Sequence, residues 1–512
     1  MAHQGTAEAS QARSVPLQVN ANRPGQVVWG ATGLSHNASI AVVRDGQILF
    51  AGESERYSRI KNDRELSPAL VEEARAFGDP DVVVWYERPL LKKTRQLRAG
   101  QWWDALDPWS MPATAVRRLL PGVPYDLHYG SHHKSHAAGG YLTSGFSSCA
   151  VVTLDAIGEW DCMTVGILDK GTFSIIRRAV YPHSIGLLFS AFTQRCGFKP
   201  NEEEFIVMGL ASYGEPKHVG AIEEDFLEHG GGTYRLRRNV HCGIGDWLPG
   251  ARVEDLAASI QAVVESVVVD IASWARRATD QSSLVLMGGL ALNCVANTRV
   301  ALESGFESIF ILPSPGDAGS AIGAAAAYVD RPLEWRGPFL GSKIDRTVSV
   351  RSVLDALESG RLVGIANGRA EFGPRALGNR SLLGDPRGQQ VKEQVNLVKG
   401  REQFRPFAPA ILAERAADYF DMPVPQSPYM QYVARCIRPA EVPAVVHVDG
   451  TSRVQTVGAE DNPLLRELLL GFEQRTGCPV LLNTSLNVRG EPLVNTWTDA
   501  QRFAHATGVE VF

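Results

Sequence analysis

The stretch Cys149-Ala150-Val151-Val152-Thr153-Leu154-Asp155 decides the fold, because a short apolar run that ends in a carboxylate is typical of a buried strand in an α/β sheet. A turn at Asp169-Lys170-Gly171 then leads into a further strand at 173–176. The same order of strand, small-residue turn and hairpin is found earlier, at residues 27–51. Two such openings predict a duplicated α/β domain with a nucleotide cleft between its halves.

The length of the chain predicts more than one domain. A chain of 512 residues is too long for a single core and suggests about two to four domains. We expect helices at 254–279 and 318–328, and a strand–Gly–helix pattern at 362–368. The predicted organisation is a disordered extension at 1–25, the duplicated domain at 26–330, a Pro-, Gly- and Arg-rich linker at 331–346, and a second α/β domain at 347–512.

Composition limits the partners and the compartment. The 44% hydrophobic and 21% charged residues are those of an ordinary globular enzyme. A net charge of −5 argues against nucleic acid, and no apolar run approaches the roughly 18 residues of a membrane span, so neither nucleic acid nor a membrane is expected as a partner. The seven cysteines are scattered and odd in number, which favours reduced thiols in the cytoplasm.

A histidine pair indicates a metal site. In Ser131-His132-His133-Lys134-Ser135-His136, His132 and His136 are four residues apart, so on a helix their rings project from one face. The turn at Gly316-Asp317 offers a carboxylate that could complete the set. Two histidines with one or two carboxylates suit Fe(II), Mn(II) or Zn(II) as a Lewis acid. The alternative is a helix-capping or core histidine pair.

Further candidates lie in loops of the first domain. His36 follows Gly33 in a loop between two strands and is a candidate proton acceptor or an exposed bystander. Asp155 at the end of its strand is placed for a metal or phosphate contact. Two glycine-rich loops are candidate nucleotide contacts, since bare N–H groups at a helix start attract phosphate, and their residues are Gly288, Gly289, Asn293 and Gly316.

The second domain is rich in cations at its motifs, although the chain as a whole is acidic. These cations alternate with Gly, Pro and Phe, which favours an ordered concave loop over a solvated surface. Cations with hydroxyl and amide donors are what a triphosphate or acyl-phosphate pocket requires. The predicted pocket residues are Arg375, Arg380, Lys399, Arg401, Arg405, Arg453, Ser485 and Asn487.

Together these motifs resemble those of the O-carbamoyltransferases of the nodulation and antibiotic-biosynthesis type, from about residue 27 to 510. The resemblance implies an N-terminal domain of actin/hexokinase type, like the threonylcarbamoyl transferase that acts on tRNA. It implies a C-terminal domain like the threonylcarbamoyl-adenylate synthase. The implied reaction forms carbamoyl adenylate from carbamoyl phosphate and ATP, with release of pyrophosphate and phosphate. The carbamoyl group then passes to a hydroxyl of a small natural product or sugar in secondary metabolism.

The resemblance also implies residue roles. His36 would take the proton of the acceptor hydroxyl. Fe²⁺, or another divalent metal, would be held by His132, His136 and Asp317, with Asp155 as a fourth ligand, and Mg²⁺ would accompany ATP. Gly288, Gly289 and Asn293 would contact the nucleotide, and the cationic residues of the second domain would bind ATP and carbamoyl phosphate. A homodimer is the default expectation.

The chain departs from the family pattern at two positions. Asn37 stands where the family tends to have Asp, and Ile206 stands where it usually has Lys, which removes a cation. A tRNA-modifying enzyme and a non-catalytic nucleotide sensor remain alternatives. The tryptophan-rich stretch 102–109 could line an acceptor site or be a surface helix.

Overall fold

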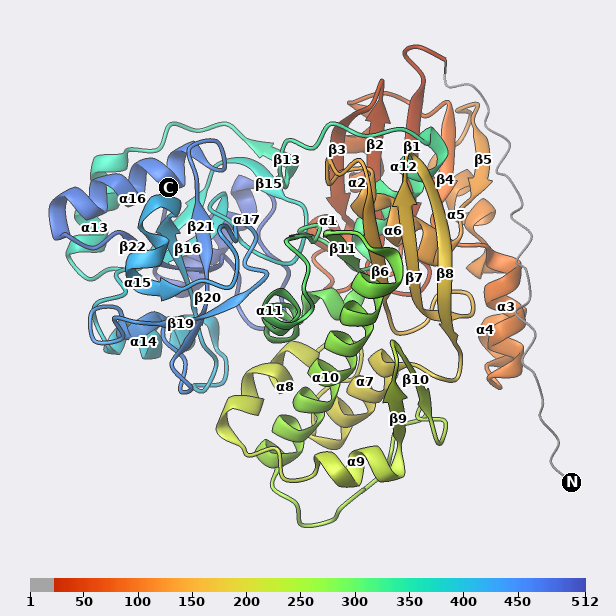
Figure 1. The fold of residues 1–512 in the computed structure, drawn as a ribbon. Helices are drawn as coiled ribbons and strands as arrows, with labels where there is room; N and C mark the ends of the chain where they lie inside the picture. Colours follow the sequence, from red (N-terminus) through yellow and green to blue (C-terminus); the bar gives the residue numbers. More distant parts are fainter. Residues whose placement is uncertain (1–22) are drawn as a thin grey trace, which may run out of the picture.

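The computed structural model describes residues 23–512, so the extension expected at 1–25 lies almost entirely outside the described residues. The chain forms a mixed α/β protein with two units side by side (Figure 1). The N-terminal unit, from red to green, contains two five-stranded sheets, and the C-terminal unit, in blue, contains a six-stranded sheet. The predicted domain boundaries stay predictions.

The first sheet has the order β3-β2-β1-β4-β5. Strands β1 and β2 are apolar and almost entirely buried, because helices cover this sheet. β1, β2 and β3 are antiparallel neighbours, whereas β4 and β5 run parallel to β1. The elements are β1 (Val27–Thr32), β2 (Ser39–Arg44), β3 (Gln47–Glu53), β4 (Val82–Trp85) and β5 (Asp126–Tyr129), with helices α1 (Ser54–Ser58), α2 (Pro68–Arg75), α3 (Pro89–Arg98), α4 (Trp102–Leu106) and α5 (Pro112–Leu119).

The second sheet has the order β8-β7-β6-β11-β12, which matches the first in both order and strand direction. The predicted strand at 149–155 is confirmed as its central strand β6, and all six of its residues are buried. Its strands are β6 (Cys149–Leu154), β7 (Asp161–Asp169), β8 (Thr172–Val180), β11 (Ser283–Met287) and β12 (Ser308–Phe310).

Two helices lie between these sheets and position the site. α12 (Ser320–Val329) packs on β1 and β2, α6 (His132–Tyr141) packs on β6 and β11, and the two helices pack on each other. Their close approach requires glycine, because a Cβ at Gly323 would lie 1.8 Å from the carbonyl oxygen of Ser135. A Cβ at Gly30 of β1 would likewise lie 1.8 Å from the carbonyl oxygen of Ala321. The packing therefore fixes α6 against the turn that precedes α12.

The other face of the second sheet is covered by helices around α10 (Val253–Thr279), which confirms the helix predicted at 254–279. α10 is the single helix within residues 23–512 that is long and apolar enough to cross a membrane, but 67% of its most apolar window is buried inside the protein, as in a core helix. Its neighbours are α7 (Ile185–Arg195), α8 (Glu204–Leu210), α9 (Val219–Asp225), α11 (Cys294–Glu303), β9 (Leu227–Gly230) and β10 (Thr233–Leu236).

The C-terminal unit is built on the sheet β21-β17-β22-β16-β14-β23, which packs against α13, α14, α16 and α17 in one core. The strand–Gly–helix pattern predicted at 362–368 is wrong in its second part. Gly368 opens strand β15, which pairs with β13, and no helix follows. The sheet and its helices are β14 (Val363–Ala366), β16 (Arg380–Gly384), β17 (Ala408–Leu412), β21 (Gln455–Val457), β22 (Val480–Ser485), β23 (Glu510–Val511), α13 (Val350–Glu358), α14 (Gln390–Lys399), α16 (Pro463–Thr476) and α17 (Trp497–Thr507).

Smaller elements complete this unit. Strand β13 lies within the segment expected as a linker. A three-stranded sheet, β18-β19-β20, stands beside the main one. These elements are β13 (Phe339–Ile344), β15 (Gly368–Glu371), α15 (Ala416–Tyr419), β18 (Phe420–Asp421), β19 (Val433–Cys436) and β20 (Thr451–Arg453).

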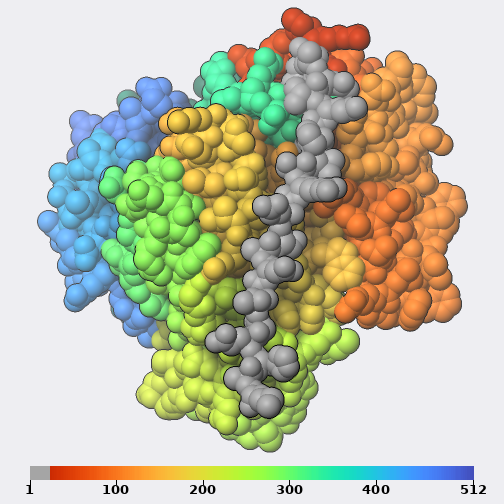
Figure 2. Space-filling model, turned by 45° about the vertical axis from the view of Figure 1, so that its right-hand side comes forward, coloured from red at the N-terminus to blue at the C-terminus, as the bar shows by residue number. Residues whose placement is uncertain are grey.

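The two units are joined by direct hydrogen bonds. Arg59 donates to the carbonyl oxygens of Leu493 and Pro492, at 2.6 and 2.9 Å. Thr298 exchanges two hydrogen bonds of 2.9 Å with the backbone of Val433. In the space-filling view the blue C-terminal unit lies against the green residues of the N-terminal unit, at the side opposite the orange segment (Figure 2). The contact holds the two units in one relative position.

Candidate functional site

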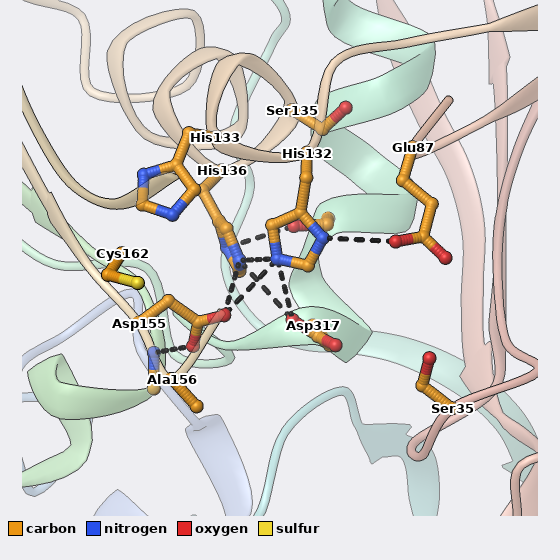
Figure 3. Close-up of polar contacts among 12 residues, drawn as sticks. Ser35, Glu87, His132, His133, Ser135, His136, Asp155, Ala156, Cys162 and Asp317 are labelled. Atoms are coloured by element: carbon orange, nitrogen blue, oxygen red, sulfur yellow. Dashed lines mark hydrogen bonds and ion pairs between the residues drawn. The ribbon is translucent and has the colours of Figure 1, made fainter. Parts of the chain in front are cut away.

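Four side chains of the N-terminal unit converge at the N-terminal end of α6 (Figure 3). Candidate ligand atoms of His132, His136, Asp155 and Asp317 all lie within 4.8 Å of one another. Nε2 of His132 is 3.2 Å from Oδ2 of Asp155 and 3.3 Å from Oδ1 of Asp317. Nε2 of His136 is 3.3 Å from the same Asp317 oxygen and 3.8 Å from the Asp155 oxygen.

Local structure explains the convergence. His132 and His136 stand one turn apart at the start of α6, as their spacing predicts. Asp155 follows the last residue of β6, and Asp317 opens the short helical turn that leads into α12. The third histidine, His133, lies outside the cluster and contacts Thr164 at 3.3 Å.

Hydrogen bonds with neighbouring groups fix the ring orientation of His136 and the position of one carboxylate oxygen of Asp155. Nδ1 of His136 lies 2.9 Å from the hydroxyl of Ser320 and 3.2 Å from the carbonyl oxygen of Pro315, so it is placed to donate to these oxygens while Nε2 faces the cluster. The backbone N–H of Gly289 donates to Oδ1 of Asp155 at 3.0 Å. The other oxygen of Asp155 therefore faces the cluster.

The cluster suits a divalent metal ion. Metal–ligand bonds of about 2.0–2.2 Å place neighbouring ligand atoms roughly 3–3.6 Å apart, which is the spacing found here. The two Nε2 atoms are only 3.1 Å apart, and the buried Oδ1 of Asp317 accepts no hydrogen bond from residues 23–512. Burial lowers the pKa of His132, but the adjacent carboxylates of Asp317 and Asp155 outweigh it and raise this pKa well above its usual value. A cation would satisfy all four groups at once.

Sequence reasoning missed a carboxylate beside this cluster. Glu87 follows strand β4, and its Oε2 lies 3.5 Å from Nδ1 of His132 (Figure 3). Its Oε1 accepts from the ammonium of Lys92 at 2.6 Å, and Lys92 also donates to Ser35, next to His36. The signal was available, because Glu87 comes directly after a buried apolar run, as Asp155 does.

His36 lies in the loop between β1 and β2, with Nε2 3.6 Å from Oδ2 of Asp317. Its side chain is 46% exposed, so a ligand can reach it. Nδ1 lies 2.8 Å from Oδ1 of Asn37, and an amide oxygen only accepts. Nε2 is thus directed toward the cluster from an accessible loop, a position from which a histidine can exchange a proton with a ligand.

The predicted glycine loops lie only partly at the cavity, and one of their backbone N–H groups is already hydrogen-bonded. A Cβ at Gly288 would lie 2.1 Å from the carbonyl oxygen of Leu154, so this glycine permits strand packing and does not line the cavity described below. The N–H of Gly289 is occupied by Asp155, and Asn293 caps α11 while it exchanges hydrogen bonds with Gln261. Gly289, Asn293 and Gly316 do line the cavity. The backbone N–H of Gly289 is therefore not free for phosphate.

Four of the predicted arginines form a cationic group in the C-terminal unit: Arg375, Arg401, Arg405 and Arg453. The side chains of Arg375 and Arg453 form no hydrogen bond or ion pair with any residue of the described range 23–512. Burial lowers the pKa of Arg375, and repulsion from Arg453 and Arg405 lowers it further. Both side chains are partly buried, and partly buried cations without a partner indicate an anion-binding site.

Lys399, Ser485 and Asn487 form one hydrogen-bonded group beside these arginines. The Lys399 ammonium donates to Oγ of Ser485 at 3.0 Å and to Oδ1 and the carbonyl oxygen of Asn487 at 2.8 and 3.0 Å. Ser485 donates to Asn487 at 2.7 Å. Because its donors are engaged, Lys399 orders the loop after β22 while its charge adds to that of the arginines.

The assignment of Arg380 to the pocket is wrong. Its side chain is fully buried and does not line the cavity. The guanidinium donates instead to five backbone carbonyl oxygens, those of Ser342, Asn367, Gly368, Asn379 and Asn495. Arg380 therefore holds together the strands and loops of the C-terminal unit. A fully buried guanidinium surrounded by carbonyl oxygens is not accessible to phosphate.

A cavity of about 800 Å³ connects the two groups of residues. Its lining includes His36, Asp155 and Asp317 from the N-terminal unit and the cationic residues of the C-terminal unit. Ile206, where the family usually has Lys, also lines it and is 2% exposed, so no cation stands at this position. The tryptophan-rich stretch 102–109 lies outside the cavity, on the surface.

Comparison with known proteins agrees with this organisation. The family model "Carbamoyltransferase N-terminus" matches residues 115–326, and "Carbamoyltransferase C-terminus" matches residues 354–512. The protein sll1178 of Synechocystis is 35% identical over 93% of both chains. The nodulation protein NolNO of Sinorhizobium fredii is 32% identical over 91% of this chain and 76% of its own. The 3′-hydroxymethylcephem-O-carbamoyltransferase of Amycolatopsis lactamdurans is 29% identical over 93% of this chain and 95% of its own.

The fold and these matches define a transferase enzyme. The chain belongs to the carbamoyltransferase family. A non-catalytic nucleotide sensor is therefore set aside.

Proposed function

We propose that this carbamoyltransferase consumes ATP and carbamoyl phosphate to form carbamoyl adenylate, and then transfers the carbamoyl group to an alcohol. Carbamoyl phosphate, ATP and one water would yield carbamoyl adenylate, pyrophosphate and phosphate. The acceptor hydroxyl oxygen would then attack the carbonyl carbon, the bond from that carbon to the AMP oxygen would break, and a carbamate ester and AMP would leave. The observation that carries this proposal is the shared cavity, with the cationic group on one side and His36 on the other.

The cationic group suits the first step. Arg375 and Arg453 offer guanidinium donors that no residue of the described chain uses, and planar guanidinium groups bind phosphate oxygens in pairs. Arg401 and Arg405 add charge from the neighbouring loop. Placing the phosphates of ATP and carbamoyl phosphate together there would offset the repulsion among the arginines. Mg²⁺ would accompany ATP.

The second step depends on His36. An alcohol is a poor nucleophile at neutral pH until a base takes its proton. Nε2 of His36 is accessible and faces the cluster, so it would take that proton as the new C–O bond forms. His132, His136, Asp155 and Asp317 would hold a divalent ion, Fe²⁺ by family resemblance, which when bound would supply Lewis-acid stabilisation of negative charge.

A single cavity suits an unstable intermediate. A carbamoyl adenylate released to water would hydrolyse, whereas a cavity closed by both units would keep it beside His36.

Several further assignments belong to the same proposal. The two sheets of matching strand order support a duplicated actin/hexokinase-type domain, and the C-terminal unit would be the adenylate-forming one. The acceptor is a small alcohol of antibiotic or other secondary metabolism, as the name of the cephem relative suggests. The enzyme acts in the cytoplasm, since all seven cysteines are free thiols, and it forms a homodimer.

Product analysis tests the proposal. We would incubate the protein with ATP, carbamoyl phosphate and a panel of alcohols, and measure AMP and carbamate ester. Equal amounts of AMP and ester are expected, with neither formed when ATP or carbamoyl phosphate is omitted. Ester formed from carbamoyl phosphate without ATP would contradict the adenylate route.

A further inference from the structure

The surface around α3 and α4 carries a group of exposed apolar side chains outside the cavity. Trp103 is 91% exposed, Trp109 72%, Leu106 70%, Leu90 69% and Trp102 59%. We call these five residues the tryptophan surface. Folded proteins rarely leave several large apolar side chains exposed together, and such groups mark sites of contact with a partner or a membrane.

The tryptophan surface is a built feature of the fold. The ammonium of Lys93 on α3 donates to the carbonyl oxygens of Ala105 and Asp107 at 3.0 and 2.9 Å, and to Oγ of Ser110 at 2.8 Å. These bonds hold α4 against α3 with Ala105 as the buried residue of α4. Trp102, Trp103 and Leu106 are consequently turned outward.

Its position separates it from catalysis. α3 and α4 lie at the edge of the molecule away from the blue C-terminal unit (Figure 1). None of the five residues lines the 800 Å³ cavity. An acceptor held on this surface would therefore not be in contact with the cavity.

The charge around the tryptophan surface indicates what binds there. Residues 88–118 contain seven Lys and Arg, two Asp and no Glu; of these cations, Arg88, Lys92 and Arg118 form ion pairs with glutamates and Arg95 is buried. Arg98 and Arg117 are exposed and form no ion pair within the described chain. A symmetric contact with a second copy would place this basic surface against itself, at an electrostatic cost. An anionic surface would complement it.

We propose that the tryptophan surface docks on an anionic phospholipid bilayer, with the indole rings at the headgroup level and the arginines on lipid phosphates. Tryptophan has an apolar body and a polar N–H, and it favours this interface. Flanking arginine supplies the electrostatic part of such binding. The expectation of no membrane partner rested on the lack of a spanning segment, which surface docking does not need.

Vesicle sedimentation of the full-length protein tests this inference. Wild type should bind vesicles of equal parts phosphatidylglycerol and phosphatidylcholine, and bind phosphatidylcholine alone much more weakly. Trp102→Ala/Trp103→Ala should lower partitioning at least tenfold, and Arg98→Gln/Arg117→Gln about fivefold for each charge removed. Leu302→Ala and Arg277→Gln, which change an exposed leucine and an exposed arginine elsewhere, are the matched controls and should bind as wild type does.

Two results would overturn the inference. The first is that wild type binds anionic vesicles no more strongly than the Trp102→Ala/Trp103→Ala variant does. The other is a dimer, seen by analytical ultracentrifugation, that the tryptophan variant loses while wild type stays off the vesicles. Because the surface lies outside the cavity, carbamoyl transfer to a soluble acceptor should be equal in all variants, so failure here is distinguishable from failure of the proposed reaction.

Discussion

Glu87 and His132 are linked by a distance of 3.5 Å between Oε2 and Nδ1, although the two residues are 45 positions apart in the chain. A carboxylate on the outer nitrogen of a histidine fixes the ring and makes the inner nitrogen more basic. Lys92 continues the contact, because it bonds to Glu87 and to Ser35 in the loop of His36. The carboxylate–histidine cluster and the proposed proton acceptor are therefore physically connected through Glu87 and Lys92.

Glu87→Gln should weaken divalent metal binding about 10–100-fold, because the ring of His132 loses its charged partner. Metal affinity is measured by titration against a competing chelator, which does not depend on catalysis. Glu72→Gln, an exposed glutamate on α2, is the matched control. Unchanged affinity in Glu87→Gln would mean that this carboxylate does not orient a ligand.

His36→Ala should slow carbamoyl transfer about 10²–10⁴-fold, the usual contribution of a positioned base. Release of pyrophosphate from ATP should be retained, because the cationic group lies in the other unit. The two half-reactions are measured separately, with and without acceptor. Loss of both would show that His36 is needed to form the adenylate or to maintain the site.

Arg375→Met should abolish adenylate formation and at the same time raise the free energy of unfolding of the ligand-free protein, by about 1 kcal/mol or more. The reason is that the partly buried guanidinium of Arg375 has no partner and is repelled by Arg453 and Arg405. Pyrophosphate at 100 times its dissociation constant should stabilise wild type by about 2.7 kcal/mol but leave the variant unchanged. Denaturant unfolding with and without pyrophosphate measures both effects. Equal stabilisation of the two proteins would place the anion site elsewhere.

Glu53 predicts a pH dependence of stability. Burial raises the pKa of Glu53 to about 7, despite the attraction of Arg56, from 4.5 in an unfolded chain. Between these values the native state binds more protons than the unfolded state, so the free energy of unfolding should fall as pH rises from 4.5 to 7. Glutamine does not titrate, so in Glu53→Gln the free energy of unfolding should fall by a few kcal/mol less over this pH range than in wild type. Chemical denaturation at pH 5 and pH 8 compares the two proteins, and parallel pH profiles would contradict the raised pKa.

Parts of the fold and the site follow from local sequence. The buried strand at 149–155, the helix at 254–279 and the placement of His132 and His136 on one helical face depend on short-range periodicity, which the sequence displays directly. Asp155 could be placed because the residue after a buried strand lies at the edge of the sheet. The ligand roles of these residues stay predictions.

Other features depend on contacts distant in sequence. Arg380 and Arg375 occur in the same motif and look alike in the sequence, yet one is enclosed by five carbonyl oxygens and the other faces the cavity. The carbonyl oxygens of Ser342 and Asn495, both distant from this motif in the sequence, help to enclose Arg380. Gly368 similarly enters a strand because β13 pairs with it. No local pattern contains that information.

Pyrophosphate release tests the central claim most directly. The purified, metal-supplied protein is incubated with ATP and carbamoyl phosphate in the absence of acceptor, and pyrophosphate is followed over time. The account predicts release that requires carbamoyl phosphate and is lost in Arg375→Met. Pyrophosphate release that is independent of carbamoyl phosphate, or no release even after addition of alcohols that become carbamoylated, would contradict the adenylate route.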